Sequence, residues 1–448
     1  MTAAEVVLWG RKIGTIVSDN DGKIKFSYDK DFSHSGIEIA PIQMPLSNNI
    51  YQYPNLVNTS FCGVPGLLAD SLPDTFGNYL INEYLAMQGR EDNSMNPVEK
   101  LLYIGSRGGG ALEYKPAIQI DDYTGELDVN ELTQLAEKVL NNRKSIDIST
   151  KDEKAMKQLL QVSSSTGGSR AKAYIAWNES TNSIRSGQIN AGEGYSYWLL
   201  KFDSVQENEN QILLPNNREY TKIEYAYYLM ASKADINMSE CRLYKENGCS
   251  HFITKRFDRT DDGKKMFMQS LAAIGHYDYE VPRTCSYEQM AIIMSKLSIP
   301  QVEKEQTFRR IVFNELSKNY DDHVKNFAFL MDKTGEWSIS PAYDITFAFN
   351  RNNQYISKHQ MLLNGKSENL TISDFIQCGS RFNLSSSTVQ RIISEVAQVV
   401  NQWPSFAEKA GVSEERMNEI RRFHNEMINT HDKSIPPSGT GESNTKNT

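Results

Sequence analysis

The chain has 448 residues, 39% hydrophobic and 23% charged, which is typical of a soluble globular protein with two or three domains. Its formal net charge of −8 argues against a large surface devoted to nucleic acid, because phosphate binding requires a concentrated basic face. The five cysteines are scattered without a C-x-x-C spacing, so we expect reduced thiols. No apolar run approaches the roughly 20 residues of a membrane span, and no secretory signal pattern opens the chain. We therefore expect a cytoplasmic protein.

The first 128 residues are predicted to form a β-rich subdomain. Apolar residues alternate over residues 24–28, directly after the turn signal Asp21-Gly22, and this is the period of a strand with one buried face. Within residues 71–87, by contrast, apolar side chains recur at i, i+4 and i+8. That spacing predicts a helix in the same subdomain.

Residues 129–258 are predicted to form a second unit of helices and strands. A helical pattern opens it, and a loop rich in Ser, Thr and Gly then leads into an apolar segment. Farther on, SYWLLKFD and HFITKRFD are interpreted as strands, and TKIEYAYYLMASKADI between them as a helix.

Residues 259–432 are predicted to be mainly helical from about Ser286 onward. The stretch NYDDHVKNFAFLMDKTGEWSISPAYD is the exception, and we interpret it as a β-hairpin within this helical region, with its turn at residues 333–336. The last residues, 433–448, are polar and rich in Ser, Thr, Pro and Gly, so we expect them to be disordered.

The stretch NYDDHVKNFAFL, residues 319–330, carries the clearest chemical signal. Asp321 and Asn326 have the spacing of a protein-kinase catalytic loop, D-x-x-x-x-N. In such a loop the Asp accepts the proton of the attacking hydroxyl, and the Asn brings an oxygen to Mg²⁺. A hard cation requires a second oxygen ligand, and Asp344, in SPAYDI after the hairpin, is placed to supply it.

Upstream residues can supply the other parts of phosphoryl transfer, which depends on positioning and charge neutralisation. Gly167 and Gly168 in STGGSRAK (165–172) allow backbone amides to approach phosphate. Lys201 lies on the next predicted strand, and Glu224, on the following helix, can pair with it. The order of loop, lysine strand, helix, catalytic loop and metal-binding Asp is the main evidence, because each piece alone is a weak signal.

Several residues near these motifs have a structural interpretation beside a functional one. A second glycine loop, SRGGGALEY (106–114), is interpreted as structural, because no lysine-bearing strand follows it before a long helical section. Asp322 is either a solvated loop residue or part of the site. His323 either caps the loop through the backbone or contacts a ligand, and Lys325 either contacts the transferring phosphate or faces water.

With these motifs in view, the chain resembles the HipA-like serine/threonine kinases, the toxins of bacterial toxin–antitoxin pairs. The resemblance covers about residues 1–430, and the matching stretches are GLLADSLPDTFGNYLINEY, YIGSRGGGALEY, STGGSRAKA, LLKFD, KRFDR, FNELSKNYDDHVKNFAFL and SPAYDI. It implies an α+β fold in which a β-rich N-terminal subdomain (1–128) precedes a two-lobed, protein-kinase-like core. The N-lobe with the phosphate loop would span 129–258, and the mainly α-helical C-lobe 259–432.

The resemblance also implies roles for individual residues. Asp321 matches the catalytic Asp of the family, and Asn326 and Asp344 match its Mg²⁺ ligands. Because the family often has an acidic residue at the position of Lys255, only backbone contacts to adenine are expected there. The ATP contacts that the resemblance implies are Gly167, Gly168, Ser169, Arg170, Ala171, Lys172, Lys201, Lys255, Arg256, Phe257, His323, Val324, Lys325, Asn326, Tyr343 and Asp344.

Further implications concern regulation and partners. Some family members phosphorylate a serine of the phosphate loop, which ejects the loop and stops the kinase. Ser165 matches this position, although the run 163–166 does not identify which hydroxyl is used. The best-known family target is glutamyl-tRNA synthetase, whose phosphorylation blocks charging and arrests growth. We therefore expect ATP and Mg²⁺ as cofactors, a helix-turn-helix antitoxin of the HipB type as partner, and DNA contact only through that antitoxin.

Three other functions stay open. The chain could serve mainly as a catalytically weak co-repressor on an antitoxin–DNA complex, although its kinase motifs are intact. A small-molecule phosphotransferase of the aminoglycoside-kinase type usually has its loop in an H-G-D context, whereas Asn319 and Tyr320 precede Asp321 here. Metal-dependent hydrolysis by residues 321–323 lacks the additional His/Asp clusters that such sites need.

Overall fold

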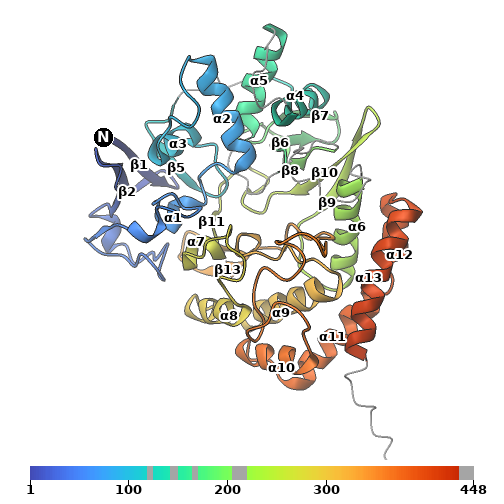
Figure 1. Cartoon of the computed structure of the whole chain (residues 1–448). Coiled ribbons are helices and arrows are strands. Elements are labelled where there is room, and N and C mark those ends of the chain that lie inside the picture. Colours follow the sequence, from blue (N-terminus) through green and yellow to red (C-terminus); the bar gives the residue numbers. More distant parts are fainter. Residues whose placement is uncertain (119–124, 142–149, 164–169, 204–218, 433–448) are drawn as a thin grey trace, which may run out of the picture.

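The computed structural model describes residues 1–118, 125–141, 150–163, 170–203 and 219–432. The predicted site residues at 165 and 167–169 and the predicted disordered tail lie outside these ranges. Figure 1 shows the blue and green strands mostly in the upper half of the molecule, and most of the later helices, coloured yellow to red, below and to the right. In the described ranges, no helix has both the length and the apolar character of a membrane span.

The N-terminal subdomain contains a five-stranded antiparallel sheet with the order β4-β3-β2-β1-β5. Its strands are β1 (Thr2–Leu8), β2 (Arg11–Ser18), β3 (Ile24–Tyr28), β4 (Ile50–Tyr51) and β5 (Leu112–Lys115). The predicted strand at 24–28 is confirmed, with alternate residues buried. The preceding turn has Gly22 in the left-handed region (φ 76°), a conformation that favours glycine.

Three helices follow within the same subdomain: α1 (Gly66–Ala69), α2 (Thr75–Met87) and α3 (Pro97–Ile104). The predicted helix at 71–87 is confirmed as α2. It begins at Thr75 because the Asp74 carboxylate caps it, accepting a hydrogen bond from the backbone amide of Gly77 (2.7 Å). Its Phe76 and Leu80 are fully buried, as their spacing predicted.

A second five-stranded antiparallel sheet has the order β7-β6-β8-β10-β9. Its strands are β6 (Lys172–Asn178), β7 (Ser183–Ser186), β8 (Ser196–Lys201), β9 (Cys241–Glu246) and β10 (Cys249–Lys255). The assignment of Lys172 to the phosphate loop is wrong: it is the first residue of β6. Its backbone pairs with β8, directly opposite Lys201.

Helices α4 (Val129–Asn141) and α5 (Thr150–Val162) pack in the hydrophobic core beside this sheet. The sequence predicts α4 but not α5, whose stretch TKDEKAMKQLLQV is mostly polar. Phe76 and Leu80 of α2 lie in the same core as both helices. Packing therefore crosses residue 128, and the domain boundary there stays a prediction.

The predicted hairpin belongs to a third sheet with the order β11-β12-β13. Its strands are β11 (Phe267–Ser270), β12 (Ala328–Met331) and β13 (Trp337–Ile339). The turn at 333–336 is confirmed, with Gly335 at a φ of 92°. The hairpin also has a third strand beside it, because β11, some 60 residues earlier in the chain, pairs antiparallel with β12.

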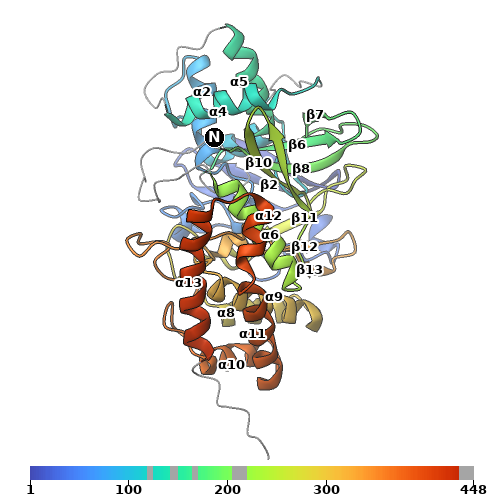
Figure 2. The same cartoon turned by 90° about the vertical axis from the view of Figure 1, so that its right-hand side faces the viewer.

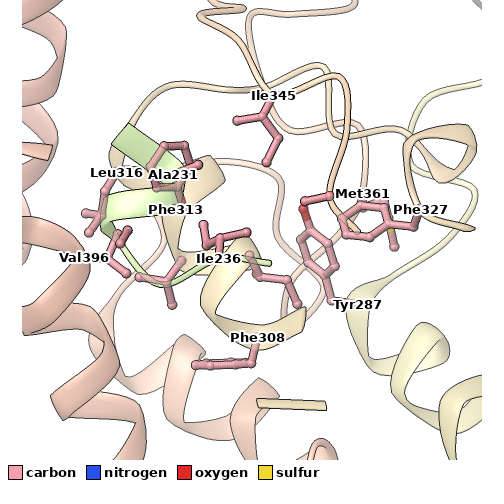
Figure 3. Packing of buried hydrophobic residues seen from close by; sticks show 14 of the residues in the cluster. Ala231, Ile236, Tyr287, Phe308, Phe313, Leu316, Phe327, Ile345, Met361 and Val396 are labelled. Atoms are coloured by element: carbon pink, nitrogen blue, oxygen red, sulfur yellow. The ribbon is translucent and has the colours of Figure 1, made fainter. Parts of the chain in front are cut away.

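The helices of the C-terminal half share one large core with α6 (Tyr220–Lys233). They are α7 (Leu271–Gly275), α8 (Tyr287–Lys296), α9 (Gln301–Leu316), α10 (Ile372–Arg381), α11 (Ser386–Val400), α12 (Trp403–Ala410) and α13 (Glu414–Asp432). Figure 2 shows α12 beside α6 and α13 beside α12. Figure 3 shows Ala231 of α6, Phe313 of α9 and Val396 of α11 meeting in this core. The predicted boundary at 258 is thus also crossed by packing and stays a prediction.

A buried ion cluster joins the N-terminal subdomain to the second sheet. Asp258 accepts two hydrogen bonds from Arg256 (2.8 Å each) and one from Arg259 (2.9 Å). The backbone amide of Gly110 also donates to Asp258 (2.7 Å), and Arg259 donates to the Gly110 carbonyl (2.8 Å). Burial opposes ionisation of Asp258, but the two guanidinium groups hold its pKa well below the ordinary value. The glycine loop at 106–114 is thereby anchored by charged groups. Its structural role stays a prediction, because Gly109, Ala111 and Leu112 also line the cavity that holds the predicted site residues.

Removing the central carboxylate of this cluster should destabilise the fold strongly. The change Asp258→Ala leaves two buried guanidinium groups without their anion, which typically costs about 3–5 kcal/mol of unfolding free energy. Urea denaturation of the purified chain measures this loss. The matched control Asp262→Ala removes an exposed carboxylate nearby and should change the midpoint little. Equal midpoints for the two variants would contradict the anchoring role.

Candidate active site

A cavity of about 410 Å³ lies among residues of the N-terminal subdomain, the second sheet and the C-terminal half. Most of the residues that the sequence predicted for the site line it together, although they are far apart in the chain. They are Arg170, Lys172, Lys201, Glu224, Lys255, Arg256, Phe257, Asp321, His323, Lys325, Asn326, Tyr343 and Asp344.

Lys201, at the end of β8, is the central cation of this cavity. Its Nζ lies 2.5 Å from Glu224 Oε1, so the predicted ion pair is present, and it also bonds to Asp344 Oδ1. Burial alone would lower the pKa of Lys201, but the two carboxylates raise it above the ordinary value. Asp344 stays ionised for the converse reason: burial opposes its charge, and the Lys201 and Lys172 ammonium groups hold its pKa below the ordinary value.

Lys172 places a second ammonium group beside Lys201. It is nearly fully buried, and its Nζ lies 3.8 Å from Asp74 Oδ2. Burial lowers the pKa of Lys172, while the nearby Asp74 and Asp344 carboxylates oppose that shift. The β6–β8 register thus places two lysines of adjacent strands at one edge of the cavity, next to the end of the loop predicted to bind phosphate.

The catalytic loop presents Asp321 and Asn326 to the same cavity. The Asn326 amide nitrogen donates to the backbone carbonyl of Asp321 (2.8 Å), which orients the amide oxygen as the atom able to bind a cation. Arg310 of α9 donates to the carbonyls of Asn326 (2.7 Å) and Tyr343 (2.9 Å). This buried guanidinium therefore connects the two segments that carry the predicted metal ligands, since Tyr343 directly precedes Asp344. The sequence analysis did not identify Arg310.

Asp344 has a left-handed backbone (φ 52°), which is uncommon for a residue with a side chain. Such conformations persist where the surrounding structure requires them, and they cluster at functional sites. Here the conformation accompanies the bond between the carboxylate and Lys201. The predicted metal ligand Asp344 therefore lines the cavity with its Oδ1 bonded to Lys201.

Aromatic rings line the part of the cavity near the end of β10. The rings of Phe257 and Tyr343 lie 5.5 Å apart between centroids, and the Tyr343 hydroxyl donates to the carbonyl of Lys325 (2.7 Å). Lys255 pairs with Asp261 (2.8 Å). The Arg256 guanidinium is committed to the Asp258 cluster, so a contact between Arg256 and a nucleotide would have to come from its backbone. An aromatic wall of this kind suits a planar base.

The remaining residues predicted to contact ATP differ in their surroundings. Lys325 lies over the ring of Tyr279, with its Nζ 4.5 Å from the centroid, and His323 Nε2 lies 4.0 Å from Asp321 Oδ1. Val324 is buried in the C-terminal core and does not line the cavity. Ala171 is likewise buried in the core beside the second sheet. A ligand contact of either residue would have to be made by the backbone.

The serine run before the phosphate loop is described only at its first residue. Ser163 is 2% exposed, and its hydroxyl donates to the carbonyl of Lys172 (2.7 Å). It therefore has a structural partner, whereas the autophosphorylation candidate Ser165 lies outside the described residues.

Behind the catalytic loop lies a buried polar cluster that the sequence analysis missed. Asp322 is fully buried and accepts hydrogen bonds from the Tyr287 hydroxyl and from the backbone amide of Gln360 (2.7 Å). As an imidazolium, His359 donates to Asp322 Oδ2 and to Glu315 Oε2, both at 2.7 Å. These bonds identify Asp322 as an anchor of the loop, not a solvated residue. His359 and Gln360 belong to no motif, so no sequence pattern indicated them.

Comparison with known proteins begins with the fold. HipA of Shewanella oneidensis MR-1, solved in a complex with HipB and operator DNA, superposes with a TM-score of 0.68 over 96% of this chain and 97% of that one, at 15% identity. The α+β fold with its β-rich N-terminal subdomain is thereby confirmed. The Helicobacter pylori kinase CtkA gives a TM-score of 0.35 at 14% identity, covering 54% of this chain and 91% of that one.

Sequence models identify the family. The model of the HipA-like C-terminal domain matches residues 164–403, more than half of the chain, and that of the HipA N-terminal domain matches residues 4–115. The chain belongs to the HipA-like family. A Haemophilus influenzae protein named "Putative kinase" is 28% identical over 159 residues, or 32% of this chain. The match spans 46% of the length of that relative.

The buried cluster should make stability depend on pH. Burial lowers the pKa of His359, but Asp322 and Glu315 outweigh it and raise the pKa from 6.5 to about 9. The folded state therefore binds the proton more tightly than the unfolded state. The stabilisation of the folded state by protonated His359 is complete below pH 6.5 and is lost as the pH rises to about 9.

The unfolding free energy of the wild type should fall across this window more steeply than that of His359→Gln, by roughly 1 kcal/mol per pH unit. Urea denaturation at several pH values measures both slopes. His34→Gln, which replaces an exposed histidine, is the matched control and should keep the wild-type slope. A His359→Gln slope equal to that of the wild type would contradict a charged His359.

Proposed function

We propose that the chain is an ATP- and Mg²⁺-dependent protein serine/threonine kinase that acts as the toxin of a toxin–antitoxin pair. One observation carries the proposal. Lys201 bonds to both Glu224 and Asp344, in the same cavity that Asp321 and Asn326 line. A lysine paired with a helix glutamate, next to a base and two oxygen ligands, is the constellation that phosphoryl transfer from ATP requires.

The residues present suit a hard cation bound with a nucleotide. The Asn326 amide oxygen and the ionised Asp344 carboxylate would hold Mg²⁺, which neutralises phosphate charge when bound. Among the described residues, no group of three or more His, Cys, Asp or Glu could hold a metal ion by itself. A site that shares its cation with substrate phosphates fits this donor set better than an all-protein cage.

The proposed reaction assigns a task to each of these groups. Asp321 orients the acceptor hydroxyl and takes its proton as the acceptor oxygen bonds to the γ-phosphorus. The bond from that phosphorus to the bridging oxygen breaks, and ADP leaves. Lys201, Lys172 and Arg170 bring positive charge to the phosphates, and Phe257 and Tyr343 provide an apolar wall for the base.

We propose a loop hydroxyl and an external protein as acceptors. Because Ser163 is buried and hydrogen-bonded, autophosphorylation is assigned to residues 164–166, with Ser165 as the first candidate. The external acceptor would be an aminoacyl-tRNA synthetase resembling glutamyl-tRNA synthetase, whose modification stalls translation. The regulating partner would be a helix-turn-helix antitoxin of the HipB type.

A second function, co-repression without significant catalysis, is favoured by the likeness in fold to a HipA solved together with HipB and operator DNA. In that case the chain would bind an antitoxin on DNA and show no phosphoryl transfer. The net charge of −8 suits contact with DNA through the antitoxin in either case.

Intact-mass spectrometry after incubation with Mg-ATP tests the kinase proposal. The starting sample is first shown to be unphosphorylated and to bind ATP, and casein is added as an external acceptor. We expect the wild type to transfer phosphate to residues 164–166 or to casein. Asp321→Ala should slow transfer by about 10²- to 10⁴-fold, because the proton acceptor is lost.

Asp262→Ala is the control, since it removes a carboxylate that does not line the cavity, and its rate should equal that of the wild type. Two outcomes oppose the proposal. If Asp321→Ala transfers phosphate at the wild-type rate, Asp321 is not the proton acceptor. A wild-type chain that binds ATP without any transfer would overturn the kinase and favour co-repression.

A further inference from the structure

Gln360 contacts both carboxylates of the catalytic loop. Its side-chain Nε2 lies 3.4 Å from Asp321 Oδ1, and its backbone nitrogen donates to Asp322 Oδ1 (2.7 Å). The two aspartates are adjacent but differ in surroundings, because the Asp321 side chain is 46% exposed and that of Asp322 is fully buried. One residue therefore links the reacting carboxylate to the anchored one.

Asp322 is held from three directions. The Tyr287 hydroxyl and the His359 imidazolium both donate to Oδ2, and the Gln360 amide donates to Oδ1. His359 also donates to Glu315, so the imidazolium lies between two buried carboxylates. A buried charge without partners is strongly unfavourable, and partners that satisfy it leave the loop one favourable position.

The segment that carries Gln360 is fixed independently of the catalytic loop. The carbonyl of Gln360 accepts from the backbone amide of Arg283 (2.6 Å). Two residues on, Leu362 donates its backbone amide to the carbonyl of Cys285 (3.0 Å) and accepts from the amide of Tyr287 (2.9 Å). Met361 is 1% exposed and lies beside Tyr287 in the C-terminal core (Figure 3). The donors of Gln360 thus lie on a packed segment that has its own backbone partners outside the catalytic loop.

We propose that Gln360 is a positioning residue for phosphoryl transfer, which directs one oxygen of Asp321 toward the amide so that the other faces the acceptor hydroxyl. His359 supports it by fixing Asp322. The inference rests on the proposed kinase function. An exposed carboxylate rotates freely unless a donor selects one orientation, and misplacement of a reacting group by about 1 Å can cost on the order of 10²-fold in rate.

A merely structural role would predict a different result from a positioning role. If Gln360 only fills space, an apolar residue of similar size should leave the rate unchanged. If it orients Asp321, the same substitution should lower kcat while ATP binding stays unchanged, because Gln360 does not line the cavity.

The test compares the wild type with Gln360→Met, and with Gln354→Met as the matched control on an exposed glutamine of the same segment. The readouts are kcat and KM for ATP in transfer to the chain or to casein, the Kd for ATP, and the Tm. We expect Gln360→Met to lower kcat by about 10- to 100-fold with an unchanged Kd. Gln354→Met should match the wild type.

A wild-type kcat in Gln360→Met overturns the positioning role and leaves the kinase proposal intact. If Gln360→Met does not fold, Gln360→Glu, which keeps the size of the side chain, decides instead. A glutamate cannot donate to Asp321 Oδ1, so kcat should again fall by about 10- to 100-fold with an unchanged Kd for ATP. A wild-type kcat in Gln360→Glu overturns the inference. Absence of transfer by the wild type overturns both the proposed function and this inference.

Discussion

The candidate site depends on the ion pairs that the ammonium group of Lys201 makes with two carboxylates. This lysine lies at the end of a strand of the second sheet, yet it bonds to Glu224 on α6 and to Asp344 on the loop after the third sheet. Because an unpaired buried charge is costly, these segments hold one another in place. Helix α6 is itself packed into the C-terminal core, where the Tyr227 hydroxyl lies 2.9 Å from His424 Nε2. The position of Glu224 is therefore set by the body of the protein.

On the side of the cavity formed by the catalytic loop, buried charges are likewise paired with partners from distant segments. The catalytic loop lies on a buried cluster in which His359 balances Asp322 and Glu315, while Arg310 ties Asn326 to the segment of Asp344. In the proposed kinase, charged groups that are already oriented would need no reorganisation when phosphate charge arrives, which is how preorganised sites stabilise a transition state. The cores around them serve mainly to keep these charges at fixed separations.

Sequence patterns were informative where the chemistry is local. The spacing of Asp321 and Asn326, the helix at 71–87 and the hairpin turn at 333–336 all depend on neighbours within one segment, and each agrees with the structure. The pairing of Lys201 with Glu224 followed from the order of elements. Gln360 could not be found in this way, because its partners lie nearly 40 residues away and no periodic pattern marks it.

By itself, the sequence determined the kinds of chemical group available and the local elements that carry them. Only the tertiary structure decided that Lys172 belongs to a strand opposite Lys201, that β11 completes the third sheet, and that Asp322 is a buried anchor. The reason is physical. Backbone pairing and ion pairs between distant segments form only when separate hydrophobic cores bring those segments together, and local periodicity records which side of an element is buried but not what it is buried against.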